Sequence, residues 1–90
     1  MTETSYALDG NAAAGVLAEL FAVDVTAAEV TCSGCGHVGP LATALAFLRG
    51  PGAVLRCRRC EQVVARVVTH SGAAWLDLSG SALWRIPTRA

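Results

Sequence analysis

The sequence contains no lysine and few charged residues of any kind: 16% of its 90 residues are charged, and all seven basic residues are arginines. Seven acidic residues cancel them to a formal net charge of +0, so no overall field favours nucleic acid or a basic partner. Hydrophobic residues make up 53% of the chain, which excludes intrinsic disorder as a description of the whole. A chain this short forms one domain, which we expect to span residues 1–90.

Long hydrophobic runs are also missing. The densest apolar segment, Leu41 to Leu48, includes Thr43 and is much shorter than the roughly 18 residues that a membrane span needs. The first residues carry Glu3 where a secretory signal has Lys or Arg, and no apolar run of signal length follows. We therefore expect a cytoplasmic protein with no membrane association. In a reducing cytosol, paired cysteines more often bind metal or perform transient redox chemistry than form structural disulfides.

The most specific signal is a set of four cysteines. They occur as two Cys-x-x-Cys pairs separated by 21 residues: Cys32 and Cys35, then Cys57 and Cys60. Two intervening residues let both sulfurs of a pair bind one ion, so the spacing is typical of two knuckles that hold one zinc ion. Because all four positions are thiolates, no coordination site is open for water, and we predict one structural Zn²⁺ without catalysis at the metal. Iron in place of zinc, a redox role of the pairs, and four reduced cysteines packed as small apolar residues are the alternatives.

Motifs of enzymes are absent. The sequence has no phosphate loop, dinucleotide-binding glycine motif, HExxH helix or serine elbow. His37 lies two residues after Cys35 and is expected beside the cysteine site rather than on the ion, and His70 is expected to be exposed. Neither histidine has a Ser, Cys or acid at the sequence spacing of a catalytic pair. Asp77 would pair with a histidine only if the fold brought the two residues together. We therefore predict that the protein is not an enzyme.

The hydrophobic pattern predicts a small α+β protein, mainly β, in which an N-terminal helix packs on an antiparallel zinc-ribbon-like sheet. Asp9 or Asn11 can cap a helix over residues 9–23, and apolar residues from Val16 to Phe21 form one broad face. Gly15 within this helix is expected to mark the close approach of another backbone.

Short β-like segments fill residues 28–86, and residues 87–90 form a tail. Leu41 to Leu48 has the Ala and Leu content of a helix, but we predict an extended strand, because Gly50-Pro51-Gly52 breaks the segment sharply. Glycines at 34 and 36 suit the first cysteine knuckle, since such turns often need a positive φ, whereas the second knuckle has none.

The charges are strongly polarised along the chain. Met1 to Thr31 contains five acids and no cation, whereas Arg49 to Ala90 contains seven Arg against two acids. Four arginines near or after the second cysteine pair are candidate contacts for anions or nucleic acid: Arg56, Arg58, Arg59 and Arg66. The simpler interpretation is that they offset the negative charge of a four-thiolate zinc site and pair with the acidic segment. Trp75 and Trp84 alternate with Leu and Ile, which favours core or partner-facing positions over a base-stacking platform.

Five segments carry a resemblance to a known family: Leu8-Asp9-Gly10-Asn11-Ala12, Phe21-Ala22-Val23-Asp24-Val25-Thr26, Cys32-x-x-Cys35-Gly36, Pro51-Gly52 ahead of Leu55-Arg56-Cys57-x-x-Cys60, and Trp75-Leu76-Asp77-Leu78. From Leu8 to Ile86 the chain resembles an uncharacterised actinobacterial family of domain-of-unknown-function proteins with a zinc-ribbon-like four-cysteine motif. The resemblance implies a bacterial cytosolic protein and brings no established activity.

The apolar content decides our leading hypothesis. A domain of this length buries only about 60% of the surface that its unfolded chain exposes. Its 53% hydrophobic residues therefore exceed what a small ribbon can hide. We predict a non-enzymatic, zinc-stapled adaptor that binds a protein partner or a second copy of itself. The two alternatives are a nucleic-acid-binding ribbon of the ribosome or transcription apparatus that uses the Arg cluster, and a thiol redox switch.

Overall fold

The computed structural model describes residues 8–18, 20–21, 24–50 and 52–88. Within this part of the chain the strands are β1 (Leu8–Asp9), β2 (Glu29–Cys32), β3 (Val38–Pro40), β4 (Leu45–Arg49), β5 (Gly52–Arg56), β6 (Val63–His70), β7 (Ala73–Asp77) and β8 (Ser81–Arg85). The helical segments are η2 (Gly10–Ala13), α1 (Ala14–Ala18), η3 (Val25–Ala27) and η4 (Leu41–Thr43), of which only α1 is an α-helix. The predicted architecture, mainly antiparallel β, is confirmed, with one short α-helix. No helix in these residues is long and apolar enough to cross a bilayer.

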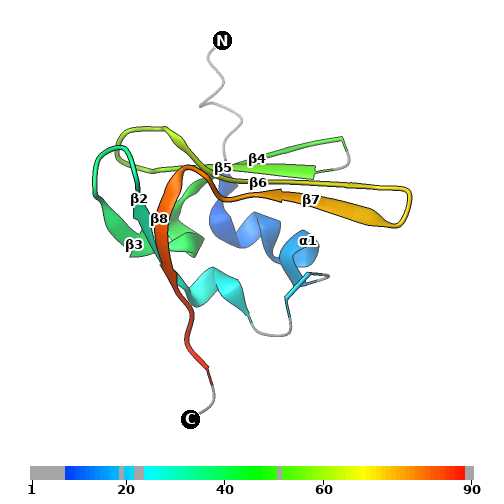
Figure 1. Cartoon of the computed structure of the whole chain (residues 1–90), viewed down its shortest axis with the longest axis horizontal. Coiled ribbons are helices and arrows are strands. Elements are labelled where there is room, and N and C mark those ends of the chain that lie inside the picture. The colour runs from blue at the N-terminus through cyan, green and yellow to red at the C-terminus, as the bar shows by residue number, and fades with distance from the viewer. Residues whose placement is uncertain (1–7, 19, 22–23, 51, 89–90) are drawn as a thin grey trace.

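The strands form two sheets rather than the single predicted one. A five-stranded sheet has the order β1-β4-β5-β6-β7, and a three-stranded sheet has the order β3-β2-β8 (Figure 1). The chain leaves β7 through a turn at residues 78–80 and crosses into the second sheet, where β8 pairs with β2. The prediction of one sheet was wrong because β2 and β8 pair across about fifty residues of sequence, which no local pattern indicates.

The predicted helix over residues 9–23 is shorter in the structure. Asp9 caps it as predicted, since its Oδ1 accepts a hydrogen bond from the Asn11 backbone N–H at 3.1 Å. A 3-10 turn and α1 then carry the chain to Ala18, and residues 19, 22 and 23 lie outside the described residues. A second 3-10 turn, η3, follows because the Asp24 side chain caps it, accepting from the Thr26 N–H at 3.0 Å.

The close backbone approach expected at Gly15 occurs at Gly10 instead. A Cβ on Gly10 would overlap the carbonyl oxygen of Leu41, whereas a Cβ on Gly15 would meet nothing within 4 Å. The helical segments therefore touch η4 at their first residue, and Gly15 only weakens the helix.

The segment from Leu41 to Leu48 is extended only in its second half. Residues Leu41–Thr43 form η4, in which the Thr43 hydroxyl donates to the Pro40 carbonyl at 2.7 Å, and β4 begins at Leu45. The preference for an extended conformation was thus correct for β4 and missed the turn before it. Beyond β8, Pro87 and Thr88 have no regular secondary structure, and residues 89 and 90 of the predicted tail lie outside the described residues.

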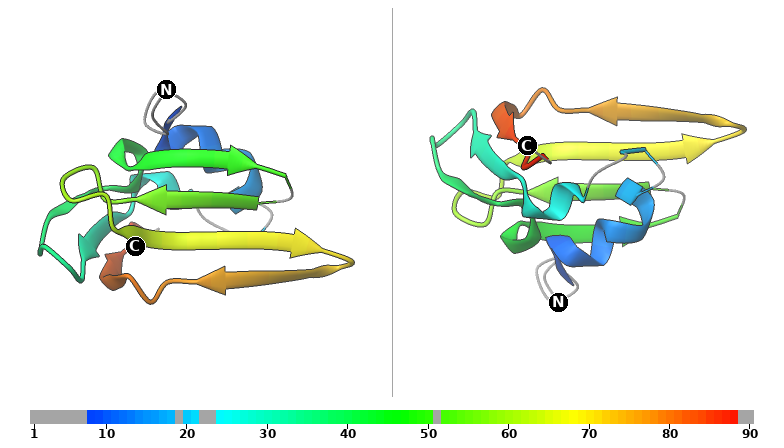
Figure 2. Two further views of the ribbon diagram at one scale, coloured as in Figure 1. Left: turned by 90° about the horizontal axis from the view of Figure 1, so that it is seen from above. Right: turned by 90° about the horizontal axis from the view of Figure 1, so that it is seen from below.

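The core lies between the inner face of the five-stranded sheet, the helical segments and the three-stranded sheet (Figure 1). Its largest fully buried side chains are Leu17, Val25, Leu41, Leu55 and Val67. Trp84 packs against this core and stacks on Phe21, with ring centroids 6.5 Å apart. Seen from above, the opposite face of the five-stranded sheet is not covered by any described element (Figure 2). Trp75 is 59% exposed, so of the two tryptophans only Trp84 joins the core.

Candidate metal centre

The two cysteine pairs lie in two β-hairpins that belong to different sheets. Cys32 ends β2 and Cys35 lies in the turn before β3, so the first pair belongs to the three-stranded sheet. Cys57 follows β5 and Cys60 lies in the turn before β6, so the second pair belongs to the five-stranded sheet. An ion bound by all four would therefore connect the two sheets.

Both knuckles have the same backbone geometry. In the first, Cys32 N–H donates to the His37 carbonyl and Gly36 N–H donates to the Cys32 carbonyl, both at 2.9 Å. In the second, Cys57 N–H donates to the Gln62 carbonyl and Glu61 N–H donates to the Cys57 carbonyl, both at 2.8 Å. The two pairs thus present their sulfurs in the same way.

The residue after each second cysteine has a positive φ. Gly36 has a φ of 77°, as the glycine in the first knuckle predicts, and Glu61 has a φ of 66° at the equivalent place. A side chain at such a φ costs conformational energy that glycine avoids. The second knuckle therefore adopts the same turn as the first, but with a conformational energy cost, because Glu61 stands where the first knuckle has Gly36.

The four sulfurs gather at one point. The closest approaches join opposite knuckles, with Sγ–Sγ distances of 3.6 Å for Cys32 and Cys60 and 3.7 Å for Cys35 and Cys57. All four sulfurs lie within 4.8 Å of one another, and none is in a disulfide. Thiolates bound tetrahedrally to zinc at about 2.3 Å lie about 3.8 Å apart, so the described geometry fits one ion. The structure thus brings together all four predicted ligands.

The cluster has a buried and an exposed side. Cys32 and Cys57 are 2% and 5% exposed, whereas Cys35 and Cys60 face solvent. Burial opposes ionisation of Cys32, but backbone N–H groups of Cys35 and Gly34 and neighbouring thiols more than offset it and lower the pKa of Cys32 to about 7. At Cys60 the Gln62 N–H favours the thiolate, but burial and three neighbouring thiols raise the pKa to about 11. A bound cation would stabilise all four thiolates together.

A hydrogen-bond network joins the knuckles beside the sulfurs. The Gly80 carbonyl accepts from the Ser33 backbone N–H at 3.0 Å, the Ser33 hydroxyl at 2.9 Å and the Gln62 side-chain amide at 3.1 Å. The same Gln62 amide donates to the Ser33 hydroxyl at 3.0 Å. The turn between β7 and β8 is thereby attached to both knuckles. Sequence reasoning missed these three residues, and because they lie far apart along the chain no local signal points to them.

The comparisons with known proteins identify a family. A family of unknown function, DUF6510, matches residues 2–89. The chain belongs to this family. The match extends beyond the predicted range from Leu8 to Ile86 at both ends. No curated protein and no solved structure matches the chain, so the function of this DUF6510 member has to be argued from its own geometry.

The arginines predicted to contact an anion have partners within the protein in most cases. The Arg56 guanidinium donates to the Glu61 carbonyl at 3.0 Å and lies 5.7 Å from the centre of the Phe47 ring. Arg58 donates to the Thr43 carbonyl at 3.0 Å. Arg59 is exposed at the tip of the second knuckle, and its backbone N–H donates to the Cys57 sulfur at 3.4 Å.

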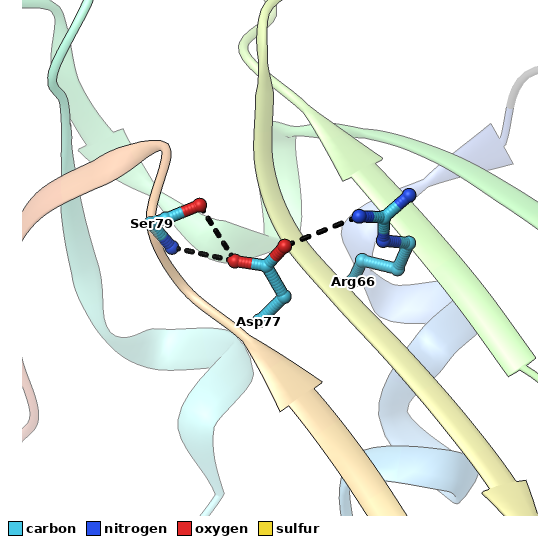
Figure 3. Close-up of polar contacts among 3 residues, drawn as sticks. All are labelled: Arg66, Asp77 and Ser79. Atoms are coloured by element: carbon cyan, nitrogen blue, oxygen red, sulfur yellow. Dashed lines mark hydrogen bonds and ion pairs between the residues drawn. The ribbon is translucent and has the colours of Figure 1, made fainter.

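Arg66 lies on the uncovered face of the five-stranded sheet, which Arg56 shares. Its guanidinium is 3.2 Å from the carboxylate of Asp77, its direct partner across β6 and β7 (Figure 3). The Ser79 hydroxyl, the Ser79 N–H and Arg66 all stabilise this carboxylate and lower the pKa of Asp77. The guanidinium groups of three of the four candidate arginines, Arg56, Arg58 and Arg66, therefore already donate to acceptors of the protein itself.

Among the described residues neither histidine belongs to the sulfur cluster, although His37 lies next to it. His37, predicted beside the site, is half-buried and lines a small cavity together with Cys32 and Cys57. His70 is exposed at the end of β6. Neither is among the four clustered side chains in the described part of the chain.

Proposed function

We propose that the four cysteines bind one zinc ion as a structural staple and that the domain is a non-enzymatic, cytoplasmic protein-interaction module. The observation that carries the metal assignment is the clustering of four sulfurs from two hairpins of different sheets. Four thiolates complete a tetrahedron and leave no position for water or substrate, which supports a structural over a catalytic ion. Free thiols suit a reducing compartment.

Zinc is the metal we favour over iron. Both ions accept four thiolates, but a site that only connects two sheets has no use for redox chemistry. Purified protein should contain one zinc per chain by elemental analysis and lack the visible absorption of an iron–thiolate site. The variant Cys57→Ser should lose most of the zinc. The control Ser33→Ala changes a polar residue of the first knuckle without removing a proposed ligand, and it should keep the zinc. Iron, or no metal above background, would contradict the assignment.

Exposed apolar side chains support the interaction role. Large hydrophobic residues reach the surface on both sheets, and Trp75 and Leu83 are 59% and 62% exposed. Single exposed apolar residues are ordinary, but in the β6–β7 hairpin three neighbours are exposed: Val68 on β6, and Trp75 and Leu76 on β7. We expect this part of the surface to be covered by a protein partner.

One observation favours a second candidate, the binding of a single-stranded nucleic acid. Because side chains alternate along strands, Phe47, Arg56 and Arg66 share the uncovered face of the five-stranded sheet with Trp75. Stacking and positive charge thus occur on one face. Against this, the Arg66 charge is held by Asp77. Titration with a labelled oligonucleotide at several salt concentrations tests this candidate. A binding constant whose logarithm falls linearly with the logarithm of the salt concentration supports it, and the absence of binding at low salt rules it out.

A further inference from the structure

Strand β7 is an edge strand without the usual protection. Exposed edges are normally shortened, charged or interrupted by proline to prevent pairing with another chain. The other edge of the same sheet, β1, has only two residues, and β3 in the second sheet contains Pro40. Strand β7 has five residues, and its one charged side chain, Asp77, lies at its end and is bound by Arg66. This edge therefore remains able to accept a further strand.

The hairpin geometry shows which backbone groups face the open edge. The turn Ser71-Gly72 between β6 and β7 has φ values of 51° and 78°, as in a type I′ turn. In such a hairpin the flanking residues, His70 and Ala73, exchange both backbone hydrogen bonds, and the pattern alternates along the strand. The amide and carbonyl groups of Ala74 and Leu76 therefore point away from β6.

Apolar side chains surround this row of backbone groups. Trp75 lies on the uncovered face of the sheet, directly beside its partner Val68 on β6. Leu76 lies on the other face and is 41% exposed. Seen from below, the helical segments lie beneath β4 and β5 and leave β7 uncovered (Figure 2). The β7 edge thus offers outward-facing backbone amide and carbonyl groups, with apolar side chains on both faces of the sheet.

We propose that a second copy of the chain adds its β7 to this edge, antiparallel about a two-fold axis at Trp75. In this register Ala74 lies opposite the second copy's Leu76, and their outward amide and carbonyl groups bond reciprocally. Trp75 lies opposite the second copy's Trp75 at a non-hydrogen-bonded position, where cross-strand Cα atoms approach to about 4.5 Å and aromatic pairs stabilise a sheet. The proposal names one partner for the interaction module proposed above and rests on that function.

A second copy fits the edge better than the other occupants. Self-pairing places no like charges opposite each other, because Asp77 faces the second copy's Ala73 and keeps its own Arg66 at 3.2 Å. It also extends the apolar row from Val68 and Trp75 across the axis. A nucleic acid on the uncovered face would leave the outward groups of Ala74 and Leu76 unpaired.

The size of the edge determines the strength of the dimer. Five residues bury much less than the about 1,200 Å² at the lower end of stable interfaces, so the dimer is weak, with a Kd between about 10 µM and 1 mM. Sedimentation equilibrium of the metal-loaded full chain from 10 µM to 2 mM should therefore show a monomer that converts to a dimer. A monomer throughout this range would overturn the proposal.

Variants on both sides of the register make the test specific. Trp75→Lys places two cations opposite each other and should raise Kd at least tenfold. Ala73→Lys faces the second copy's Asp77 and should lower Kd about two- to fivefold, whereas Ala73→Asp should raise it by a similar factor. The matched control Leu83→Lys changes an equally exposed residue of the other sheet and should leave Kd within twofold.

The outcomes separate this proposal from the metal assignment. Zinc content should stay at one per chain in the β7 variants, so a protein that dimerises without zinc would contradict only the metal assignment. A dimer that Leu83→Lys weakens, and Trp75→Lys does not, would overturn pairing through β7. Hydrogen exchange gives a direct readout, since the Ala74 and Leu76 amides should become protected as the protein concentration rises. Protection that appears only on addition of another protein or an oligonucleotide would also refute a second copy.

Discussion

Removal of the metal is the most informative perturbation of this fold. The three-stranded sheet has little core of its own, since β3 has no buried residue and β2 buries only Val30 and Cys32. The five-stranded sheet carries most of the apolar contacts with the helical segments, through residues such as Leu55 and Val67. The ion would therefore provide much of what holds β2 and β3 to the rest of the molecule.

The magnitudes lead to the same expectation. Structural zinc sites contribute about 10–16 kcal/mol of apparent binding free energy at neutral pH. A domain of 90 residues has a total unfolding free energy of about 5–13 kcal/mol at the usual 0.05–0.15 kcal/mol per residue. A zinc-binding free energy of this size equals or exceeds the whole free energy of unfolding. We therefore expect the apo protein to lose the three-stranded sheet and most of its cooperative unfolding.

The assay compares three samples by urea unfolding and circular dichroism: the metal-loaded protein, the chelated protein, and the variant Cys57→Ser. The chelated protein and the variant should show reduced strand signal and no steep transition. The control Ser33→Ala loses hydrogen bonds to Gly80 and Gln62 but no ligand, so it should lose no more than about 1–2 kcal/mol. An apo protein with an unchanged spectrum and an unchanged urea midpoint would refute the structural role of the ion.

Two further predictions concern glycine positions and are read from urea midpoints. Gly10→Ala should destabilise the protein by more than about 2 kcal/mol, because the added Cβ would overlap the Leu41 carbonyl. Gly15→Ala should stabilise it by about 0.5–1 kcal/mol, because a Cβ there meets nothing. A Gly15→Ala variant less stable than Gly10→Ala would contradict the described packing. Glu61→Gly should stabilise the second knuckle by up to about 1 kcal/mol, and Gly36→Ala should destabilise the first by about 1–2 kcal/mol, with zinc content unchanged in both. Equal and small effects at Glu61 and Gly36 would argue against equivalent knuckles.

Features that depend on neighbouring residues were predictable from the sequence. The spacing of the four cysteines predicted that their sulfurs form one cluster, and Asp9 marked the start of the helical segment. The helix ended earlier than its apolar pattern indicated, because the chain closes in a turn in which the Leu20 and Phe21 N–H groups both donate to the Leu17 carbonyl. Hydrophobic periodicity does not register such a turn.

Features that depend on distant residues were not predictable. The division into two sheets follows from the pairing of β2 with β8, and the attachment of both knuckles to Gly80 follows from the same crossing. Polar residues such as Ser33 and Gln62 look like ordinary turn residues until the fold brings them together. The partners of Arg66 and Asp77 likewise depend on the register of β6 and β7.

The crossing from β7 to β8 has a consequence for the order in which the molecule is completed. All four cysteines precede Glu61, whereas Gly80 and β8 follow about twenty residues later in the chain. Until β8 emerges, β2 has β3 on one side and an open edge on the other. A growing chain therefore has all four cysteines before it has its complete second sheet, and the pairing of β8 is the step that closes the edge of β2.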